Sequence, residues 1–148
     1  MIFKSYLIEK NINDLKKKII LFYGENLGLK NFFKNEIKDK NKNCDIISIH
    51  QDKIIKEKNF LMSEIKNVSL FEKKKIFLID QASDKIFQAI EETLPFIENQ
   101  SLFLFSEILE RKSKIRNMIE KSSDCAAIAC YPDNELGIKK IIQNELKG

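Results

Sequence analysis

The chain has 148 residues, of which 43% are hydrophobic and 32% are charged, and it carries a formal net charge of +4. This composition is typical of one globular domain with its own core, and no apolar run approaches the roughly 20 residues that cross a bilayer. The start, MIFKSYLIEK, lacks a secretory-signal pattern, and three irregularly spaced cysteines favour a reduced, cytoplasmic setting over a disulfide framework.

The excess of positive charge is small and does not by itself predict nucleic-acid binding. The 26 basic residues are interspersed with 22 acidic ones along most of the expected helices. Net charge bears on non-specific association and not on fold. The two lysine runs, Lys16–Lys18 and Lys73–Lys75, are therefore interpreted as solvated surface, and any DNA contact is expected to be indirect or weak.

Five short apolar runs predict five β-strands. Each has five or six residues, is rich in β-branched or aromatic types and is nearly continuous in apolarity, as a strand buried on both faces requires. The runs are Ile19–Tyr23, Asp45–His50, Ile76–Asp80, Leu102–Ser106 and Ala126–Tyr131.

Helical periodicity follows every one of these runs, because apolar residues recur at three- to four-residue spacing. Strand and helix that alternate five times predict an α/β fold, with a five-stranded, mostly parallel sheet and helices on both faces. The helical stripes are Leu29, Phe32, Phe33 and Ile37; Ile54, Leu61 and Ile65; Ile86, Ile90, Leu94 and Ile97; Ile115, Met118 and Ile119; and Ile138, Ile141 and Ile142.

Few signals interrupt this pattern, so residues 1–148 are expected to form a single domain. Asp84 is predicted to cap a helix that begins near Lys85, and Pro132–Asn134 breaks the chain before the last helix. That helix either packs back on the sheet or leads into further domains.

The first strand leads into a glycine-bearing loop and then a helix, which is the setting of a phosphate-binding loop. Aligned on G-x-x-x-x-G-K-[ST] with Gly24 first, Lys30 takes the lysine position. Leu29 then replaces the second glycine, Asn31 replaces the hydroxyl that would hold magnesium, and Glu25 adds negative charge. The loop is thus predicted to be a degenerate P-loop, with weak phosphate binding left open.

The end of the third strand would carry the companion acid of such a site. Asp80 lies where a magnesium-orienting carboxylate is expected, but Gln81 follows it instead of a second acid. Without that acid and the loop hydroxyl, metal-assisted attack of water on a γ-phosphate has no agents. Nucleotide hydrolysis is therefore not expected, and a plain loop role for Asp80 is the other interpretation.

Four segments in order resemble the delta subunit of bacterial DNA polymerase III clamp loaders. They are LFYGENLGLK in the first loop, SLFEKKKIFLID (Ser69–Asp80), ERKSKIR (Glu110–Arg116) and AAIACYPDNE (Ala126–Glu135). The resemblance implies a P-loop NTPase/AAA+-like N-terminal domain that does not hydrolyse ATP. It also implies a cytoplasmic protein that binds the sliding clamp (the beta subunit), works with the other clamp-loader subunits and helps open the ring for loading onto primed DNA.

The same resemblance places the clamp contact on Leu70 and Phe71, with Ser69 beside them. It assigns no catalytic residue, cofactor or metal to this domain, although the family is part of the polymerase holoenzyme. It also implies lid and collar domains beyond this chain. Independently, two adjacent large apolar residues in a polar connection are a plausible binding anchor, since few residues carry most of an interface's energy. The alternative is that both cap the edge of the core.

Other groups of polar residues are weaker candidates for a functional site. His50 is interpreted as a satisfied residue at the end of a strand, and Cys44, Cys125 and Cys130 do not have zinc-site spacing. Ser113, Lys114 and Arg116 belong either to a subunit interface or to a solvated helix face. Rival functions are an active P-loop ATPase or kinase, a receiver-like phosphorylation domain, and an AAA+-like adaptor that does not bind the clamp.

Overall fold

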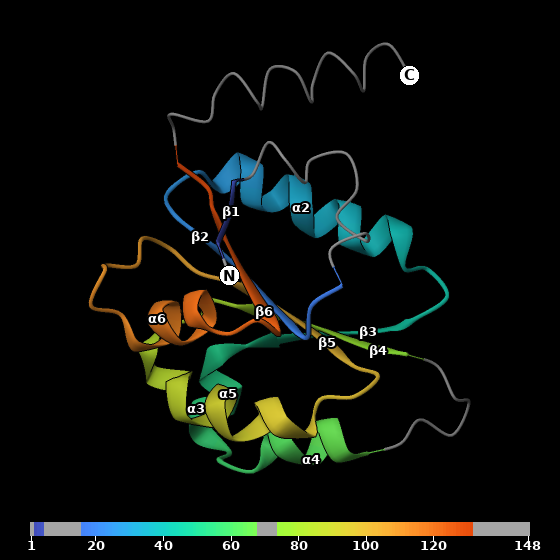
Figure 1. Cartoon of the computed structure of the whole chain (residues 1–148). Coiled ribbons are helices and arrows are strands. Elements are labelled where there is room, and N and C mark those ends of the chain that lie inside the picture. Colours follow the sequence, from blue (N-terminus) through green and yellow to red (C-terminus); the bar gives the residue numbers. More distant parts are fainter. Residues whose placement is uncertain (1, 5–15, 68–73, 132–148) are drawn as a thin grey trace.

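The computed structural model of the chain describes residues 2–4, 16–67 and 74–131, which form one parallel sheet flanked by helices. The sheet has six strands in the order β1-β6-β2-β5-β4-β3, and all their pairings are parallel (Figure 1). The strands are β1 (Ile2–Lys4), β2 (Ile19–Tyr23), β3 (Asp45–His50), β4 (Lys75–Asp80), β5 (Ser101–Phe105) and β6 (Cys125–Ala129).

The predicted α/β class and all five predicted strands are confirmed, each to within two residues. The strand β1 was not predicted. It has three residues and pairs only with β6, at one edge of the sheet. The sheet therefore has six strands where the sequence indicated five.

Burial along the strands follows their position in the sheet. All residues of β2 and β5, which lie at the centre, are buried. In β3 only Ile49 is buried, because this strand is at the other edge and pairs with β4 alone. The expectation of burial on both faces is thus wrong for Asp45–His50.

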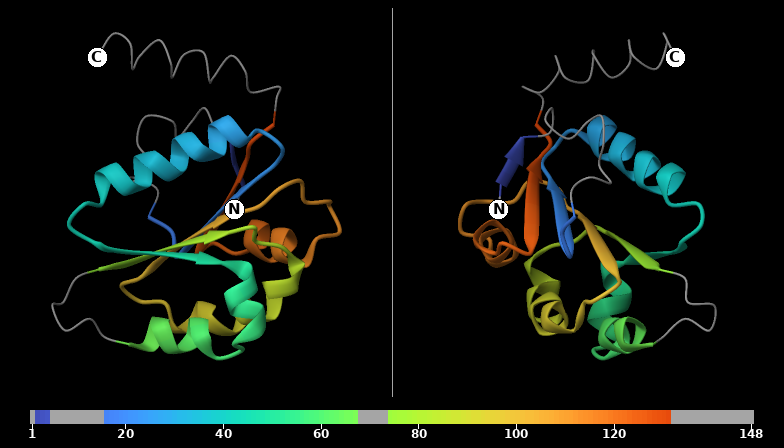
Figure 2. Two further views of the ribbon diagram at one scale, coloured as in Figure 1. Left: turned by 180° about the vertical axis from the view of Figure 1, so that it is seen from behind. Right: turned by 45° about the vertical axis from the view of Figure 1, so that its right-hand side comes forward.

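Helices cover both faces, as predicted, but unequally. In Figure 1 α2 lies on one side of the sheet, and α3, α4, α5 and α6 lie on the other; Figure 2 shows the same layers from two further directions. None of the described helices is long and apolar enough to cross a membrane. Their bounds are α2 (Leu27–Lys40), α3 (Gln51–Lys56), α4 (Phe60–Lys66), α5 (Phe87–Thr93) and α6 (Lys114–Lys121), with 3₁₀ turns η2 (Asp84–Ile86) and η3 (Leu94–Phe96) on either side of α5.

Each face of the sheet has its own hydrophobic core, because successive strand residues point to opposite faces. On the α2 side, Phe22 is the centre of an aromatic stack, with ring centroids 5.0 Å from both Phe33 and Phe105. On the other side, the predicted stripes of α3 and α4 are buried at Ile54, Leu61 and Ile65.

The predicted cap at Asp84 is wrong. Ser83 caps the turn after β4, since its hydroxyl accepts a hydrogen bond from the amide of Lys85. Asp84 instead reaches the start of α6, which is thirty residues further along the chain, and accepts hydrogen bonds from the amides of Lys114 and Ile115. The carboxylate thus caps a helix, but a different one.

Candidate functional site

The proposed clamp contact, Ser69, Leu70 and Phe71, lies outside the described residues, so only its surroundings can be placed. The connection that contains it leaves α4 at Lys66 and enters β4 at Lys75. Both attachments are fixed: Gln100 Nε2 donates to the carbonyl of Ile65 at 2.6 Å, and the Asp45 amide donates to the carbonyl of Lys74 at 2.9 Å. The connection therefore begins and ends at the edge of the sheet where the strands start.

The loop between β2 and α2 is at the opposite edge, where the strands end. Gly24 has φ +120°, a backbone conformation that L side chains rarely adopt. A Cβ at this position would lie 2.2 Å from the carbonyl oxygen of Cys130, just after β6. Close approach of two backbone segments thus accounts for the glycine without any phosphate.

Backbone amides of this loop are used inside the fold. Gly24 N donates to the carbonyl of Glu107 at 3.0 Å, and Asn26 N donates to that of Cys130 at 2.9 Å. Asn26 also caps α2, accepting from Leu29 N through its side chain at 3.1 Å and from Lys30 N through its carbonyl at 3.1 Å. A phosphate-binding loop instead turns such amides toward the ligand.

Lys30, at the position of the phosphate-binding lysine, is also engaged internally. Its side chain is buried, and Nζ donates to the carbonyl of Ser106 at 3.0 Å. Burial lowers the pKa of Lys30 from its usual 10.5, while neighbouring Cys130 and Glu107 oppose that shift. Asn31, where a magnesium-binding hydroxyl would stand, is exposed and supplies no hydroxyl.

Asp80, the predicted companion acid, forms an ion pair with Lys34 of α2. The Lys34 ammonium group also lies 4.7 Å from the centroid of the Phe105 ring. The carboxylate that was predicted to orient magnesium is therefore paired with a lysine of the helix. The next residue, Gln81, has φ 60° and is exposed.

One polar group at this edge lacks a partner among the described residues. The hydroxyl of Ser106 is buried at the end of β5 and makes no hydrogen bond there, although the Ser106 amide donates to the carbonyl of Phe22 at 2.8 Å. It remains available to a water molecule or ligand. A single hydroxyl beside an engaged lysine does not make a triphosphate site, for which several converging donors are needed.

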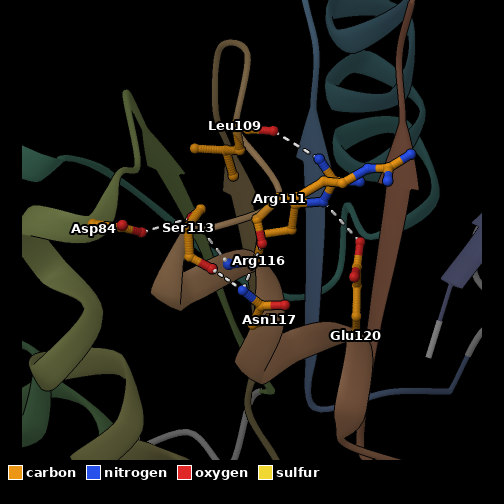
Figure 3. A network of polar contacts seen from close by, with 7 residues as sticks. All are labelled: Asp84, Leu109, Arg111, Ser113, Arg116, Asn117 and Glu120. Atoms are coloured by element: carbon orange, nitrogen blue, oxygen red, sulfur yellow. Dashed lines mark hydrogen bonds and ion pairs between the residues drawn. The ribbon is translucent and has the colours of Figure 1, made fainter.

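The basic stretch Glu110–Arg116 is divided between the interior and the surface (Figure 3). Arg116 donates to the carboxylate of Glu120 and to the carbonyl of Leu109, and its guanidinium lies 4.7 Å from the Tyr23 ring centroid. Burial acts to lower the pKa of Arg116, but the Glu120 hydrogen bond together with the charge interactions of Tyr23, Glu120 and Tyr131 outweighs it, and the pKa is raised. Arg116 is thus a packing residue.

Ser113 has a structural role in the same network. It caps α6 by accepting from Arg116 N, and its hydroxyl donates to Asp84 at 2.7 Å. In Figure 3 the Asp84 and Ser113 side chains face one another at the start of the helix. Of the three residues singled out from sequence, only Lys114 is exposed, so they do not form one basic surface.

The single histidine and the cysteines have local roles. His50 caps α3, with Nδ1 accepting from the Asp52 amide at 3.2 Å, so its interpretation as a satisfied strand-end residue is confirmed. Burial raises the pKa of the Cys130 thiol to about 12, which makes it unreactive as a thiolate at neutral pH. The described residues contain no group of three potential metal ligands.

Comparisons with known proteins give a structural likeness at low sequence identity. No protein-family model matches the sequence, and a search of curated proteins finds no match. Among solved structures, the chain is similar to domain III of the replication initiation protein DnaA from Thermotoga maritima, with 18% sequence identity and a TM-score of 0.48. The match covers 97% of this chain and 66% of that one, so the chain spans slightly less than two thirds of its length.

Proposed function

We propose that this chain is a non-hydrolysing, AAA+-like domain of a clamp-loader delta subunit, which binds the sliding clamp through Leu70, Phe71 and Ser69 during DNA replication. The four sequence segments that resemble the delta family support the identity of the domain. The geometry of the first loop supports the absence of hydrolysis. The other loader subunits are proposed as partners of the full-length protein.

The engagement of the first loop is the observation on which the non-hydrolysing part rests. Hydrolysis of a nucleotide needs converging amides, a lysine on the phosphates, a held magnesium ion and a group that positions water. Here the amides of Gly24 and Asn26 and the ammonium of Lys30 donate to carbonyls of neighbouring segments. The carboxylate of Asp80 forms an ion pair with the ammonium group of Lys34. We therefore regard the loop as a degenerate P-loop that now serves the fold.

The environment of the connection between α4 and β4 supports its role as the clamp contact. Leu61 and Ile65 of α4 are buried, whereas Lys66 and Asn67 are exposed; Lys74 is exposed before Ile76 enters the core. The chain thus reaches the surface on both sides of residues 68–73. An apolar pair in such a connection is suited to filling a pocket on a partner.

Binding of purified sliding clamp by the full chain tests the proposal, measured by surface plasmon resonance. The variant Leu70→Ala/Phe71→Ala should bind on the order of 1,000-fold more weakly, because central hot-spot residues contribute about 2 kcal/mol or more each and each 1.4 kcal/mol is about tenfold in affinity. The matched control is Leu27→Ala/Ile108→Ala, which removes two exposed apolar side chains at the other edge of the sheet.

Three outcomes would contradict the proposal. Unchanged clamp binding by the Leu70→Ala/Phe71→Ala variant would remove the pair from the interface. Unfolding of that variant, seen by circular dichroism, would mean that the pair belongs to the core. Magnesium-dependent nucleotide binding that is abolished by Lys30→Ala would favour an active P-loop ATPase instead.

A further inference from the structure

A cavity of about 350 Å³ lies at the amino-terminal edge of the sheet, opposite the first loop. Strands that run parallel begin at the same edge, so the residues that precede β2 and β4 are brought together there even though β5 lies between them. Four lysines line this cavity: Lys16, Lys17 and Lys18 before β2, and Lys74 before β4. Lys16–Lys18 and Lys74, which are far apart in the sequence, therefore share one site.

The charged residues around the cavity are predominantly positive. Glu98 is the single carboxylate in its lining, although acidic residues nearly equal basic ones over the whole chain. No ion pair joins any of the four lysines to a carboxylate in the described ranges, and of their ammonium groups only that of Lys17 makes a hydrogen bond there, to the carbonyl of Ser123 at 2.7 Å. The ammonium groups of Lys16, Lys18 and Lys74 therefore remain available to an external anion, and that of Lys17 would have to leave the Ser123 carbonyl.

The walls of the cavity limit the kind of anion that it suits. Ile76 and Phe103 contribute apolar surface and Asn99 contributes an amide group, whereas the Gln100 amide is already held by the carbonyl of Ile65 and the backbone amide of Glu98. The volume is at the lower end of small-molecule pockets, which begin at about 300 Å³. A space of that size with apolar and amide walls suits one nucleobase, and several flexible lysines around it suit consecutive phosphates.

We propose that this lysine cavity, formed by Lys16, Lys17, Lys18 and Lys74 above Ile76 and Phe103, binds single-stranded nucleic acid. The lysines contact backbone phosphates and one base enters the hollow. The site lies outside residues 68–73 and does not depend on clamp binding. It replaces the interpretation of these lysine runs as solvated surface with a direct contact.

Fluorescence anisotropy with a labelled single-stranded DNA oligonucleotide tests the site in the full chain. The variant Lys16→Gln/Lys17→Gln/Lys18→Gln/Lys74→Gln should bind at least tenfold more weakly at low salt. For this variant, the slope of log K against log salt concentration should decrease in magnitude by roughly 2 to 3, since each phosphate contact contributes about 0.7 to the slope for a single strand. Glu98→Gln should bind more tightly than the natural chain, and Glu91→Gln, on exposed α5 surface, should not.

A control of equal charge separates the site from general electrostatics. The variant Lys56→Gln/Lys58→Gln/Lys85→Gln/Lys112→Gln removes four exposed lysines that do not line the cavity and should change affinity less than threefold. If the fourfold cavity variant does not fold, Lys16→Gln/Lys74→Gln, at two exposed positions, should still weaken binding severalfold.

The inference is overturned if the cavity variant and the control variant lose oligonucleotide affinity equally, or if neither loses affinity. Competition then identifies the ligand. Displacement of the oligonucleotide by inorganic phosphate or by ATP at equal phosphate concentration would mean a free-phosphate site and refute the nucleic-acid assignment. Equal affinity for blunt duplex DNA would refute the entry of a base into the hollow.

Discussion

Substitution of Gly24 by alanine distinguishes a glycine required by the fold from a glycine required by phosphate. The new Cβ would stand 2.2 Å from the carbonyl oxygen of Cys130, and ordinary contact begins at 3.4 Å. Because the obstacle is backbone at the end of a buried strand, no side-chain rotation relieves it. The positive φ adds strain of its own, on the order of 1–3 kcal/mol for a residue with a side chain.

The expected cost follows from the contacts that must move. Separating the two segments weakens the hydrogen bonds from Asn26 N to Cys130 O (2.9 Å) and from Cys130 N to Tyr23 O (2.6 Å), each worth about 1 kcal/mol. With the backbone strain, Gly24→Ala should lower the free energy of unfolding by about 3–5 kcal/mol. Urea denaturation followed by circular dichroism measures this loss.

The same loop offers a matched control in Gly28. It lies in the first turn of α2, and its added Cβ would meet nothing closer than Asn26 Oδ1 at 3.6 Å. Gly28→Ala should therefore leave stability unchanged or raise it by up to about 1 kcal/mol. A loss below 1 kcal/mol for Gly24→Ala would refute the structural role of this glycine. Loss of nucleotide affinity with stability intact would show that Gly24 serves phosphate.

Two further predictions concern the cap of α6 and the chemistry of the first loop. Burial acts to raise the pKa of Asp84, but hydrogen bonds from Ser113, Ile115 and Lys114 outweigh it and the pKa lies below the usual 3.8. Stabilisation by Asp84 is thus complete above pH 3.8 and is lost as the pH falls through the lower folded pKa. Urea denaturation should show the natural chain to be more stable than Asp84→Asn by up to about 1 kcal/mol at pH 6, since Asp84 is exposed and solvent screens its charge, and the two should converge in acid; a pH-independent difference would contradict the role of the charge in the cap. The variant Leu29→Gly/Asn31→Thr restores the phosphate-loop sequence but should still not bind fluorescent ATP, because Lys30 remains engaged with the Ser106 carbonyl. Binding in the micromolar range would show that these two residues alone prevent nucleotide binding in the natural chain.

The local sequence pattern was sufficient to predict the central strands and most of the helices. Continuous apolar runs such as Ile19–Tyr23 mark strands whose two faces are both covered, and these agree with the structure. The edge strand β1 could not be predicted in this way, because three residues carry no pattern and its position depends on the open edge of β6. The break between α3 and α4 is hidden for a similar reason: Ile54 and Leu61 are seven residues apart, which also fits one continuous helix.

The sequence predicted which phosphate-binding residues the first loop lacks, but not which contacts its remaining residues make. Leu29 and Asn31 already depart from the phosphate-loop pattern in the sequence. That Lys30 donates to Ser106 and that Lys34 pairs with Asp80 are long-range facts, fixed only when α2 packs on the sheet. The same is true of Asp84, whose helix-capping chemistry was recognised and whose partner helix was not.

The two edges of this parallel sheet differ in what they leave for a partner. At the edge where the strands end, the amides of Gly24 and Asn26 and the side chains of Lys30 and Asp80 have partners within the chain. At the edge where the strands begin, the lysine cavity has an unbalanced positive charge, and Lys74, one of the cavity lysines, directly precedes β4 at the end of the connection proposed to bind the clamp. The proposed clamp contact and the proposed nucleic-acid contact therefore lie on the same side of the sheet. The two proposals are nonetheless separable, because Leu70→Ala/Phe71→Ala removes no charge and should leave oligonucleotide affinity unchanged.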